Sequence, residues 1–399
     1  MKCGVCQSLN LKTCTACESD RRFSSIDQHV NAKFTTTAMA MSNTDRSVLT
    51  DLISSTLALL KQFSHSLTPA SNTNIHDAAK PSENPPDPLR VLGDSAKLLK
   101  AHTTKLSLLA INKPFTPSAI TKVLKELVGT CLPGMMSAVQ ICEQDRARYG
   151  ALLSKEAQLR VRRVFMELEM LLNELSSIAA GSSGESRRDS LSSTGVVWES
   201  CDALIELEHL GLGGLALQKV EQYQETIKDA LKELQEWAAG DDPDSEGHDA
   251  LLDSDDEGVA GDHDSLEDIF NAANSMPKDR PELKALLDGA DGKLKKVVML
   301  YAALTKRRIK TFETQVQADT VEMSRITRLD QLMLHLKRIP HQIDELAGCF
   351  YDLDENAVQE SLQKCLVEAK AADHAMEVNW AGEEDEFTVW LRKWNAAIG

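Results

Sequence analysis

The sequence predicts an all-α fold: two antiparallel helical bundles separated by a disordered acidic linker. Three observations support this prediction. Apolar residues recur at three- and four-residue spacing along nearly the whole chain, which is the period of an amphipathic helix. Aromatic residues make up only 5% of the 399 residues, with 20 Gly and 12 Pro, and this composition disfavours sheet sandwiches. One acidic, glycine-containing run, residues 240–268, cannot bury enough apolar surface to offset its chain entropy.

The first predicted helices follow the N-terminal extension. Apolar residues from Leu49 to Phe63 mark the first helix, and Leu92–Ala110 shows the same spacing after a Pro-rich polar loop. Pro117 then stands where the first residue of a helix tolerates proline. Pro133 and Gly134 are predicted to break or kink the chain before a further helix that runs through Cys142.

Residues 155–180 form the most strongly periodic stretch, and a loop rich in Ser and Gly follows it. A short helix is predicted at Val197–Leu210, ending at Gly211. The next apolar stripe, Leu217–Ala238, covers only about three heptads and is interrupted by Gln224. We therefore expect this stripe to pack inside its own bundle rather than to form a leucine zipper.

Beyond the acidic run, Pro281 is predicted to open a long helix through roughly residue 322. Further helices are predicted at residues 325–338, 340–351 and 354–377, with Pro340 separating the first two. The amphipathic segment from Phe387 to Trp394 is expected to be a last helix that caps the bundle. The predicted organisation is a Cys-rich, disordered extension (residues 1–41), an N-terminal helical bundle (42–239), an acidic linker (240–268) and C-terminal helices that complete a second bundle (269–399).

The charge balance excludes several classes of function. The chain has 44 Lys and Arg against 61 Asp and Glu, a net charge of −17, so phosphate backbones would repel it and direct nucleic-acid binding is not expected. No apolar run reaches the roughly 18 residues that span a bilayer. The N-terminal sequence lacks the apolar core of a signal peptide, and nine Cys without such a signal are typical of a reduced, intracellular protein.

Four cysteines near the N-terminus form a C-x2-C-x7-C-x2-C array of Cys3, Cys6, Cys14 and Cys17. Four thiolates can hold zinc tetrahedrally, so the array is a candidate zinc site. The spacing between the two pairs is shorter than the about 15–20 residues of common zinc ribbons. An unstructured cysteine-rich tail, or an extension upstream of a start near Met39 or Met41, explains the same residues.

The acidic run contains the second candidate site. Asp253, Asp255, Asp256 and Glu257 with the following Gly258 overlap the ligand spacing of an EF-hand calcium loop. The twelfth position is Asp264 instead of a bidentate Glu, and no amphipathic helix precedes the loop, so a solvated acidic tract explains the same residues. We interpret the run as an electrostatic docking or regulatory segment.

Three serines are candidate phosphorylation sites. Ser254 and Ser265 each have a carboxylate three residues later, which is the pattern of acidophilic kinases, whereas Ser190 follows Arg187 and Arg188. A phosphate at these positions would add nearly two negative charges and alter docking to a basic partner.

The sequence contains none of the usual catalytic motifs: no HExxH, nucleophile elbow, phosphate-binding loop or dinucleotide fingerprint. We therefore expect no enzymatic activity, no cofactor and no small-molecule ligand. The cysteines in helical patterns are interpreted as small buried hydrophobes. Trp198 and Cys201 are predicted to be core residues of the N-terminal bundle.

Four blocks in succession resemble the Grap- and cyclin-D-interacting (GCIP) family of cyclin-D-binding proteins. They are Thr194–Leu207, Gln222–Trp237, Glu282–Leu300 and Arg328–Val358, with the acidic run between the second and third. The resemblance spans roughly residues 45–375. Two segments have no clear counterpart in the family: residues 1–41 and the tail Asn379–Gly399. The tail carries Trp380, Trp390 and Trp394.

The resemblance implies an all-helical, non-enzymatic regulator of the nucleus and cytoplasm that binds a cyclin or a helix-loop-helix transcription regulator. Restraint of cell-cycle progression is the function that it implies. A structural adaptor similar to the vinculin and talin bundles, tethering cytoskeletal or membrane-associated partners, is the alternative, because the fold would be the same. Cosedimentation with actin filaments distinguishes the two classes.

Overall fold

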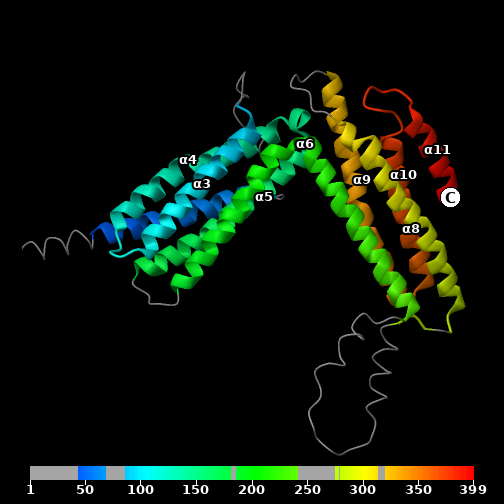
Figure 1. Cartoon of the computed structure of the whole chain (residues 1–399), viewed down its shortest axis with the longest axis horizontal. Coiled ribbons are helices and arrows are strands. Elements are labelled where there is room, and N and C mark those ends of the chain that lie inside the picture. The colour runs from blue at the N-terminus through cyan, green and yellow to red at the C-terminus, as the bar shows by residue number, and fades with distance from the viewer. Residues whose placement is uncertain (1–43, 69–85, 181–185, 241–274, 278, 313–319) are drawn as a thin grey trace, which may run out of the picture. The chain divides into compact units, whose positions relative to one another are not determined.

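The computed structural model describes residues 44–68, 86–180, 186–240, 275–277, 279–312 and 320–399. For residues 186–191 and 320–323 it describes the backbone alone. Helices make up nearly all of this part of the chain, and the described residues form no strand, which confirms the all-α prediction (Figure 1). The first helix covers residues 44–66. The others are α3 (Pro88–Ile111), α4 (Pro117–Gln144), α5 (Arg146–Ala179), α6 (Ser186–Ala239), α8 (Pro281–Arg307), the 3-10 turn η3 (Ile309–Thr311), α9 (Thr320–Tyr351), α10 (Glu355–Ala375) and α11 (Glu386–Ile398).

The chain divides into two compact units. The first contains the described residues up to Val139 together with Gln158–Glu206, and the second contains Gln140–Ala157 together with the described residues from Leu207 onward. Both units therefore draw on segments that are separated in the sequence. The predicted boundary at the acidic linker stays a prediction, because residues 241–274 lie outside the described residues.

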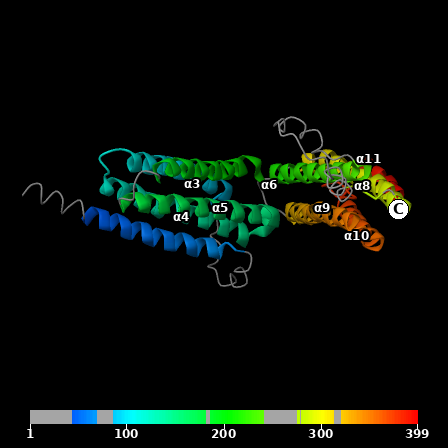
Figure 2. The same ribbon diagram turned by 90° about the horizontal axis from the view of Figure 1, so that it is seen from below.

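The first unit is a bundle whose helices lie side by side along a common direction (Figure 2). Asp87 caps the start of α3, where its carboxylate accepts a hydrogen bond from the Leu89 backbone N–H at 3.1 Å, and Pro88 occupies the first helical position. Between α3 and α4 only residues 112–116 intervene, so these helices run antiparallel. The core includes Phe165 of α5, whose ring centroid lies 6.0 Å from that of Phe63.

The predicted break at Pro133 is wrong, because α4 continues through this proline. A proline inside a helix removes one backbone hydrogen bond and costs about 3 kcal/mol. Leu127, Cys131, Leu132 and Met135 around it are fully buried. Burial of these side chains on both sides of the proline stabilises the helical path by more than the lost bond costs.

The second unit contains the helical hairpin of α9 and α10, and α10 also packs against α8 and α11 (Figure 1). Asp354 caps α10 by accepting hydrogen bonds from the backbone N–H groups of Asn356 and Ala357. The predicted separation at Pro340 is also wrong, since α9 runs through this residue. Ile339 and Ile343 beside it are buried, as in the case of Pro133.

The end of α8 differs from the prediction of a helix through residue 322. The helix ends at Arg307, and Arg308 leaves the helical conformation with φ −123° and ψ −55°. The Arg308 guanidinium is buried and forms two hydrogen bonds with the Asp385 carboxylate. This buried charge pair, which joins residues far apart in the chain, outweighs the local helical tendency of the basic sequence that follows.

Two glycines of the second unit interrupt helices: Gly150 in α5 and Gly211 in α6. Gly211 has φ 59° and ψ −165°, which confirms the predicted end of a helix there, and Gly150 has φ 78° and ψ 152°. Only glycine adopts these conformations without strain. After Gly211, the stripe Leu217–Ala238 buries Ile227, Leu231 and Leu234, but it does so in the second unit and not in the predicted N-terminal bundle.

The carboxyl group of Asp373 on α10 is a buried acid with a raised pKa. Its side chain is 4% exposed and accepts a hydrogen bond of 2.8 Å from the Asn395 amide of α11. Burial, which is the largest cause, and the nearby Glu377 raise the pKa of Asp373 to about 6, against the opposing effect of His374. Since the folded-state pKa exceeds the ordinary value, stability falls as the pH rises from about 4 to about 6.

We expect Asp373→Asn to raise the free energy of unfolding by about 1–3 kcal/mol at pH 7.5, because the amide keeps the hydrogen-bond acceptor and removes the buried charge. The gain should shrink towards zero as the pH falls below 4.5, where the acid is protonated in the folded protein. Urea titrations at several pH values measure this effect. The exposed Asp288→Asn is the control, and an equal gain in both variants would contradict the explanation.

Candidate interaction surface

Most of the site residues predicted from the sequence lie outside the described residues. This holds for the array of Cys3, Cys6, Cys14 and Cys17, for the acidic residues Asp253, Asp255, Asp256 and Glu257, and for the serines Ser254 and Ser265. Ser190 lies in α6, where the structure describes the backbone alone. These candidates stay predictions.

The two predicted core residues differ from each other. Cys201 is fully buried, and burial raises the pKa of its thiol to about 12. Trp198 is 37% exposed, so the prediction that it belongs to the core is wrong. Val197, Cys201 and Leu204 share the buried face of α6, and Trp198 is rotated about 100° from Val197, towards the solvent.

The described side chains do not assemble a metal site, since no group of three or more His, Cys, Asp or Glu among them is close enough to hold an ion. The prediction that helical cysteines are small buried hydrophobes is confirmed for Cys131, Cys142, Cys201 and Cys365, whereas Cys349 is half-buried. Within the described helices, none has the length and apolar character to cross a membrane.

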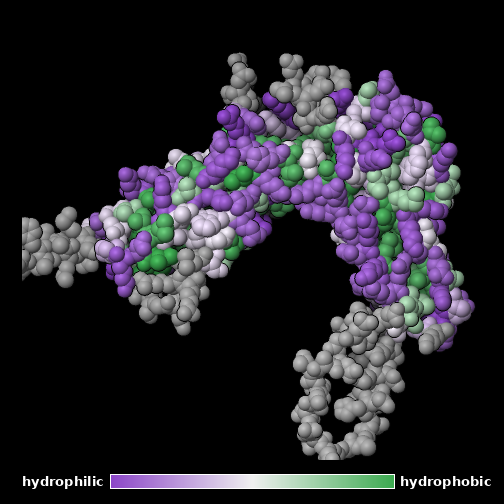
Figure 3. Space-filling model, in the orientation of Figure 1, coloured by the Kyte–Doolittle hydropathy of each residue, from purple (hydrophilic) through white to green (hydrophobic). Residues whose placement is uncertain are grey.

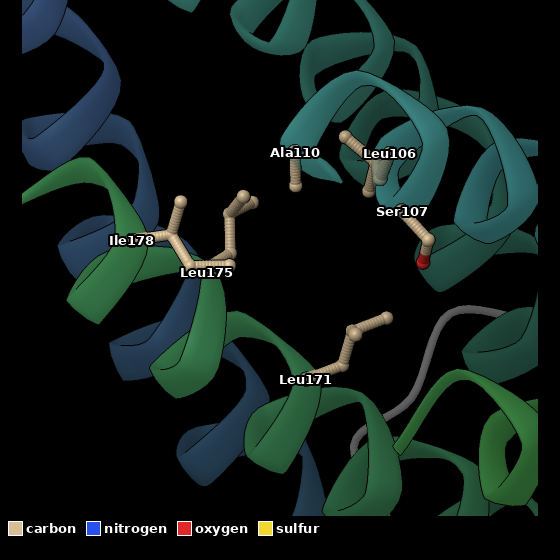
Figure 4. A pocket seen from close by; sticks show the side chains of 6 residues that line it. All are labelled: Leu106, Ser107, Ala110, Leu171, Leu175 and Ile178. Atoms are coloured by element: carbon tan, nitrogen blue, oxygen red, sulfur yellow. The ribbon is translucent and has the colours of Figure 1, made fainter. Parts of the chain in front are cut away.

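A small apolar pocket lies between α3 and α5 in the first unit (Figure 4). Leu106, Ser107 and Ala110 line it from α3, and Leu171, Leu175 and Ile178 line it from α5. Its volume is about 240 Å³, part of which is open to solvent. Pockets that bind small molecules usually offer several convergent polar groups. This one offers a single hydroxyl, which is already hydrogen-bonded to Thr194, so it is a packing gap rather than a ligand site.

The outer face of α5 carries an exposed apolar surface that we call the α5 ridge, formed by Leu159, Met166 and Met170. Their exposed fractions are 48%, 51% and 58%. The spacings of seven and four residues place the three side chains on one face of the helix. On the opposite face, Phe165, Leu168 and Leu172 are buried. Hydrophobic residues also reach the surface between hydrophilic areas in the view of Figure 3.

Ion pairs hold α5 in place on both sides of the ridge. Glu169 lies 3.5 Å from the Lys61 ammonium of the first helix, and Arg163 lies 3.4 Å from the Glu199 carboxylate of α6. The Arg160 guanidinium also donates a hydrogen bond to the Ala203 backbone carbonyl. Exposed pairs of this kind contribute little stability, but they fix which face of α5 points outward.

The α5 ridge was not predicted from the sequence, although residues 155–180 were recognised as the most periodic stretch. A signal for it was present. Leu159, Met166 and Met170 repeat at helical spacing on the side opposite the main apolar stripe, so the helix has apolar residues on two faces. Methionine is flexible and polarizable, and exposed methionines are frequent at surfaces that bind other proteins.

One protein family and two relatives match parts of this chain. Residues 91–240 match the family described as Grap2 and cyclin-D-interacting, N-terminal. An uncharacterised protein of Schizosaccharomyces pombe is 28% identical over 323 residues, which are 79% of this chain and 85% of that protein. The Cyclin-D1-binding protein 1 homolog of Xenopus laevis is 26% identical over 261 residues, which are 65% of this chain and 70% of that protein.

The matched segment contains all of α5, and therefore the whole α5 ridge, as well as the kinked helix α6. The fold is helical throughout the described residues, as the resemblance implies. The family is named for binding another protein and not for a reaction. Over residues 91–240 the chain is thus similar to the N-terminal region of the Grap2 and cyclin-D-interacting family.

Proposed function

We propose that this protein is a non-enzymatic regulator that binds a cyclin or a helix-loop-helix transcription regulator and thereby restrains cell-cycle progression. The names of the matching family and of the Xenopus laevis relative support a cyclin as the partner. The proposal places the protein in the nucleus and the cytoplasm, where such partners act.

The observation that carries the proposal is the α5 ridge inside the segment that matches the family. Side chains that expose about half of their surface on a helix fixed by its neighbours form a preorganised contact surface. Two methionines in the ridge can adapt to the shape of a partner.

The acidic run has a second role in the proposal. Its negative charge would steer a basic partner surface towards the protein, because complementary charge raises association rates. Phosphorylation of Ser254 and Ser265 would strengthen this attraction by adding further negative charge. Deleting residues 241–264 should therefore slow association with the partner while leaving the contact at the α5 ridge.

We expect the double substitution Met166→Glu and Met170→Glu to weaken binding to a purified D-type cyclin at least about 30-fold, because it would place two charges in a desolvated contact. Isothermal titration calorimetry with the full chain measures the dissociation constant. Met299→Glu is the matched control, since Met299 is 55% exposed on α8, outside the matching segment. Circular dichroism verifies that both variants keep their helices.

Equal binding by the two variants would exclude the α5 ridge as the contact. If the unaltered chain binds neither a D-type cyclin nor a helix-loop-helix regulator, the proposed function is wrong. Cosedimentation of the chain with actin filaments would then favour the structural adaptor predicted as the alternative.

A further inference from the structure

The connection between α3 and α4 contains the sequence pattern of a protein-kinase target. Residues 114–117 are Pro-Phe-Thr-Pro. Kinases bind their substrates as extended segments, and proline two residues before and one residue after the acceptor favours an extended backbone. This Pro-x-Thr-Pro pattern is typical of substrates of the mitogen-activated type of proline-directed kinase. Among the other Ser and Thr of the chain only Thr68 precedes a proline, and Ser66 stands two residues before it, so Thr116 alone has the full pattern.

The Thr116 hydroxyl is accessible in the fold. Residues 112–116 are not helical, and the Thr116 side chain is exposed. Its Oγ1 donates a hydrogen bond of 3.1 Å to the Pro114 carbonyl, which rotation of the side chain breaks. Pro117, the first residue of α4, has no N–H, and the Ile120 N–H lies 3.3 Å from the Thr116 carbonyl, a long hydrogen bond. A kinase therefore has to open only the first turn of α4, and helix ends open more readily than helix interiors.

Two unpaired cations lie near this hydroxyl. The Arg46 guanidinium of the first helix lies 5.9 Å from the centroid of the Phe115 ring, and Lys113 precedes Thr116 by three residues. Both cations are exposed, and neither pairs with a carboxylate of the described residues. The start of the first helix and the connection between α3 and α4 lie at the same end of the first unit (Figure 2).

The same surroundings favour a negative charge on Thr116. The first turn of α4 contains no acidic residue, and the N-terminus of a helix carries a partial positive charge. A phosphate on Thr116 would stand at this N-terminus, beside the Phe115 ring that Arg46 already contacts. Guanidinium groups form strong, charge-assisted hydrogen bonds with phosphate oxygens. The described side chains thus offer cations to a phosphate and no carboxylate of the first turn to repel it.

We propose that Thr116 is a phosphorylation site for a proline-directed kinase, and that Arg46, Lys113 and the start of α4 bind the resulting phosphate. The Thr116 Oγ1 attacks the γ-phosphorus of ATP and forms the new O–P bond, while the bond from this phosphorus to the β,γ-bridging oxygen breaks. ADP leaves with the electron pair of that bond, and the hydroxyl proton passes to a base of the kinase. The phosphate then ties the first helix to the connection between α3 and α4. Neither the α5 ridge nor a cyclin enters this inference, so it stands apart from the proposed function.

The test incubates the purified full chain with an active mitogen-activated kinase, ATP and Mg²⁺, and locates the phosphate by mass spectrometry of peptides. We expect phosphate at Thr116, retention of it in Thr116→Ser, and loss of incorporation in Thr116→Ala. Thr68→Ala is the matched control, because it removes the other Thr-Pro pair and should be phosphorylated as fully as the unaltered chain.

Equal incorporation into Thr116→Ala and the unaltered chain would overturn the proposal. A peptide of residues 110–123 separates recognition of the sequence from access in the fold. If the kinase modifies this peptide but not the folded chain, the site is closed in the protein and the proposal is wrong. It is equally wrong if the kinase, active on a standard substrate, modifies neither.

Hydrogen exchange of the phosphorylated and unmodified chains tests how the phosphate is bound. The amides of Ser118–Ile120 should exchange about two- to fivefold more slowly after phosphorylation, because an anion stabilises the first turn of α4. Arg46→Gln should reduce this slowing, whereas Arg90→Gln, which removes an exposed cation at the other end of α3, should leave it unchanged. No slowing in the unaltered chain, or the same slowing in Arg46→Gln, would overturn the assignment of the phosphate's contacts.

Discussion

Replacing Arg308 with alanine is expected to lower the free energy of unfolding of the second unit by about 3–5 kcal/mol. The guanidinium is buried and donates to both carboxylate oxygens of Asp385, and its Nε donates to the Met376 carbonyl at 3.1 Å. The substitution leaves a cavity, an unpaired carbonyl and a carboxylate without its cation. These are the losses that make broken buried ion pairs costly.

Urea unfolding followed by tryptophan fluorescence measures this change, since Trp380 donates a hydrogen bond from its indole to the Arg308 carbonyl. The neighbouring Arg307 is exposed, so Arg307→Ala is the matched control and should change the free energy by less than about 0.5 kcal/mol. Asp385→Asn keeps an N-cap residue and removes the charge, so we expect an intermediate loss. Similar values for Arg308→Ala and Arg307→Ala would contradict the role of the buried pair.

The pH dependence of the same pair has a definite sign. Hydrogen bonding to Arg308 lowers the pKa of Asp385 to about 2, with Thr388 contributing in the same direction and burial opposing them. A depressed folded-state pKa stabilises the protein above the ordinary carboxyl pKa, and this contribution is lost as the pH falls through about 2. In Arg308→Ala this contribution is absent, so the difference in free energy of unfolding between the unaltered chain and the variant should shrink as the pH falls towards 2.

Gly150→Ala is expected to destabilise the second unit by about 2–4 kcal/mol, because two costs combine. At φ 78° and ψ 152° a side chain is strained, and the added Cβ would lie 3.3 Å from both the Asp330 carboxylate and the Ile326 side chain. Asp330 caps the helical segment after Gly150, accepting hydrogen bonds from the N–H groups of Ala151 and Leu152 at 2.6 and 3.0 Å. Displacing this carboxylate would leave the cap unmade.

Thermal unfolding of the full chain measures the loss. Gly289 in α8 is the control, because it is helical and a Cβ there would meet no atom within 4 Å. Gly289→Ala should stabilise the protein by about 0.5–1 kcal/mol. The explanation from backbone conformation fails if both alanine variants shift the melting temperature in the same direction.

Local sequence patterns predicted the helices well and their ends less well. The apolar periodicity is a property of each segment, so the all-α class and the interruption at Gly211 were predictable. The continuity of α4 and α9 through Pro133 and Pro340 was not, because burial by distant helices opposes the local penalty of proline. The end of α8 depends on Asp385, a partner 77 residues away, which no local pattern indicates.

The candidate site was predictable only in part. The resemblance of residues 194–207 and 222–237 to the family indicated a binding protein, and the matching segment includes them. The exposure of Trp198 depends on which face of α6 its neighbours cover, and periodicity alone did not settle this. The α5 ridge escaped prediction because exposed apolar residues in a strongly periodic helix are easily assigned to the core.

The cap that Asp330 places on Ala151 and Leu152 joins residues that are 179 and 178 positions apart. During synthesis, the described part of the first unit is complete once Glu206 has left the ribosome, whereas residues 140–157 must wait for α9. At about 5–20 residues per second, this wait lasts roughly 10–40 seconds. The protein is therefore expected to fold in two stages during synthesis. The first unit folds first, and residues 140–157 pack only after α9 has been synthesised.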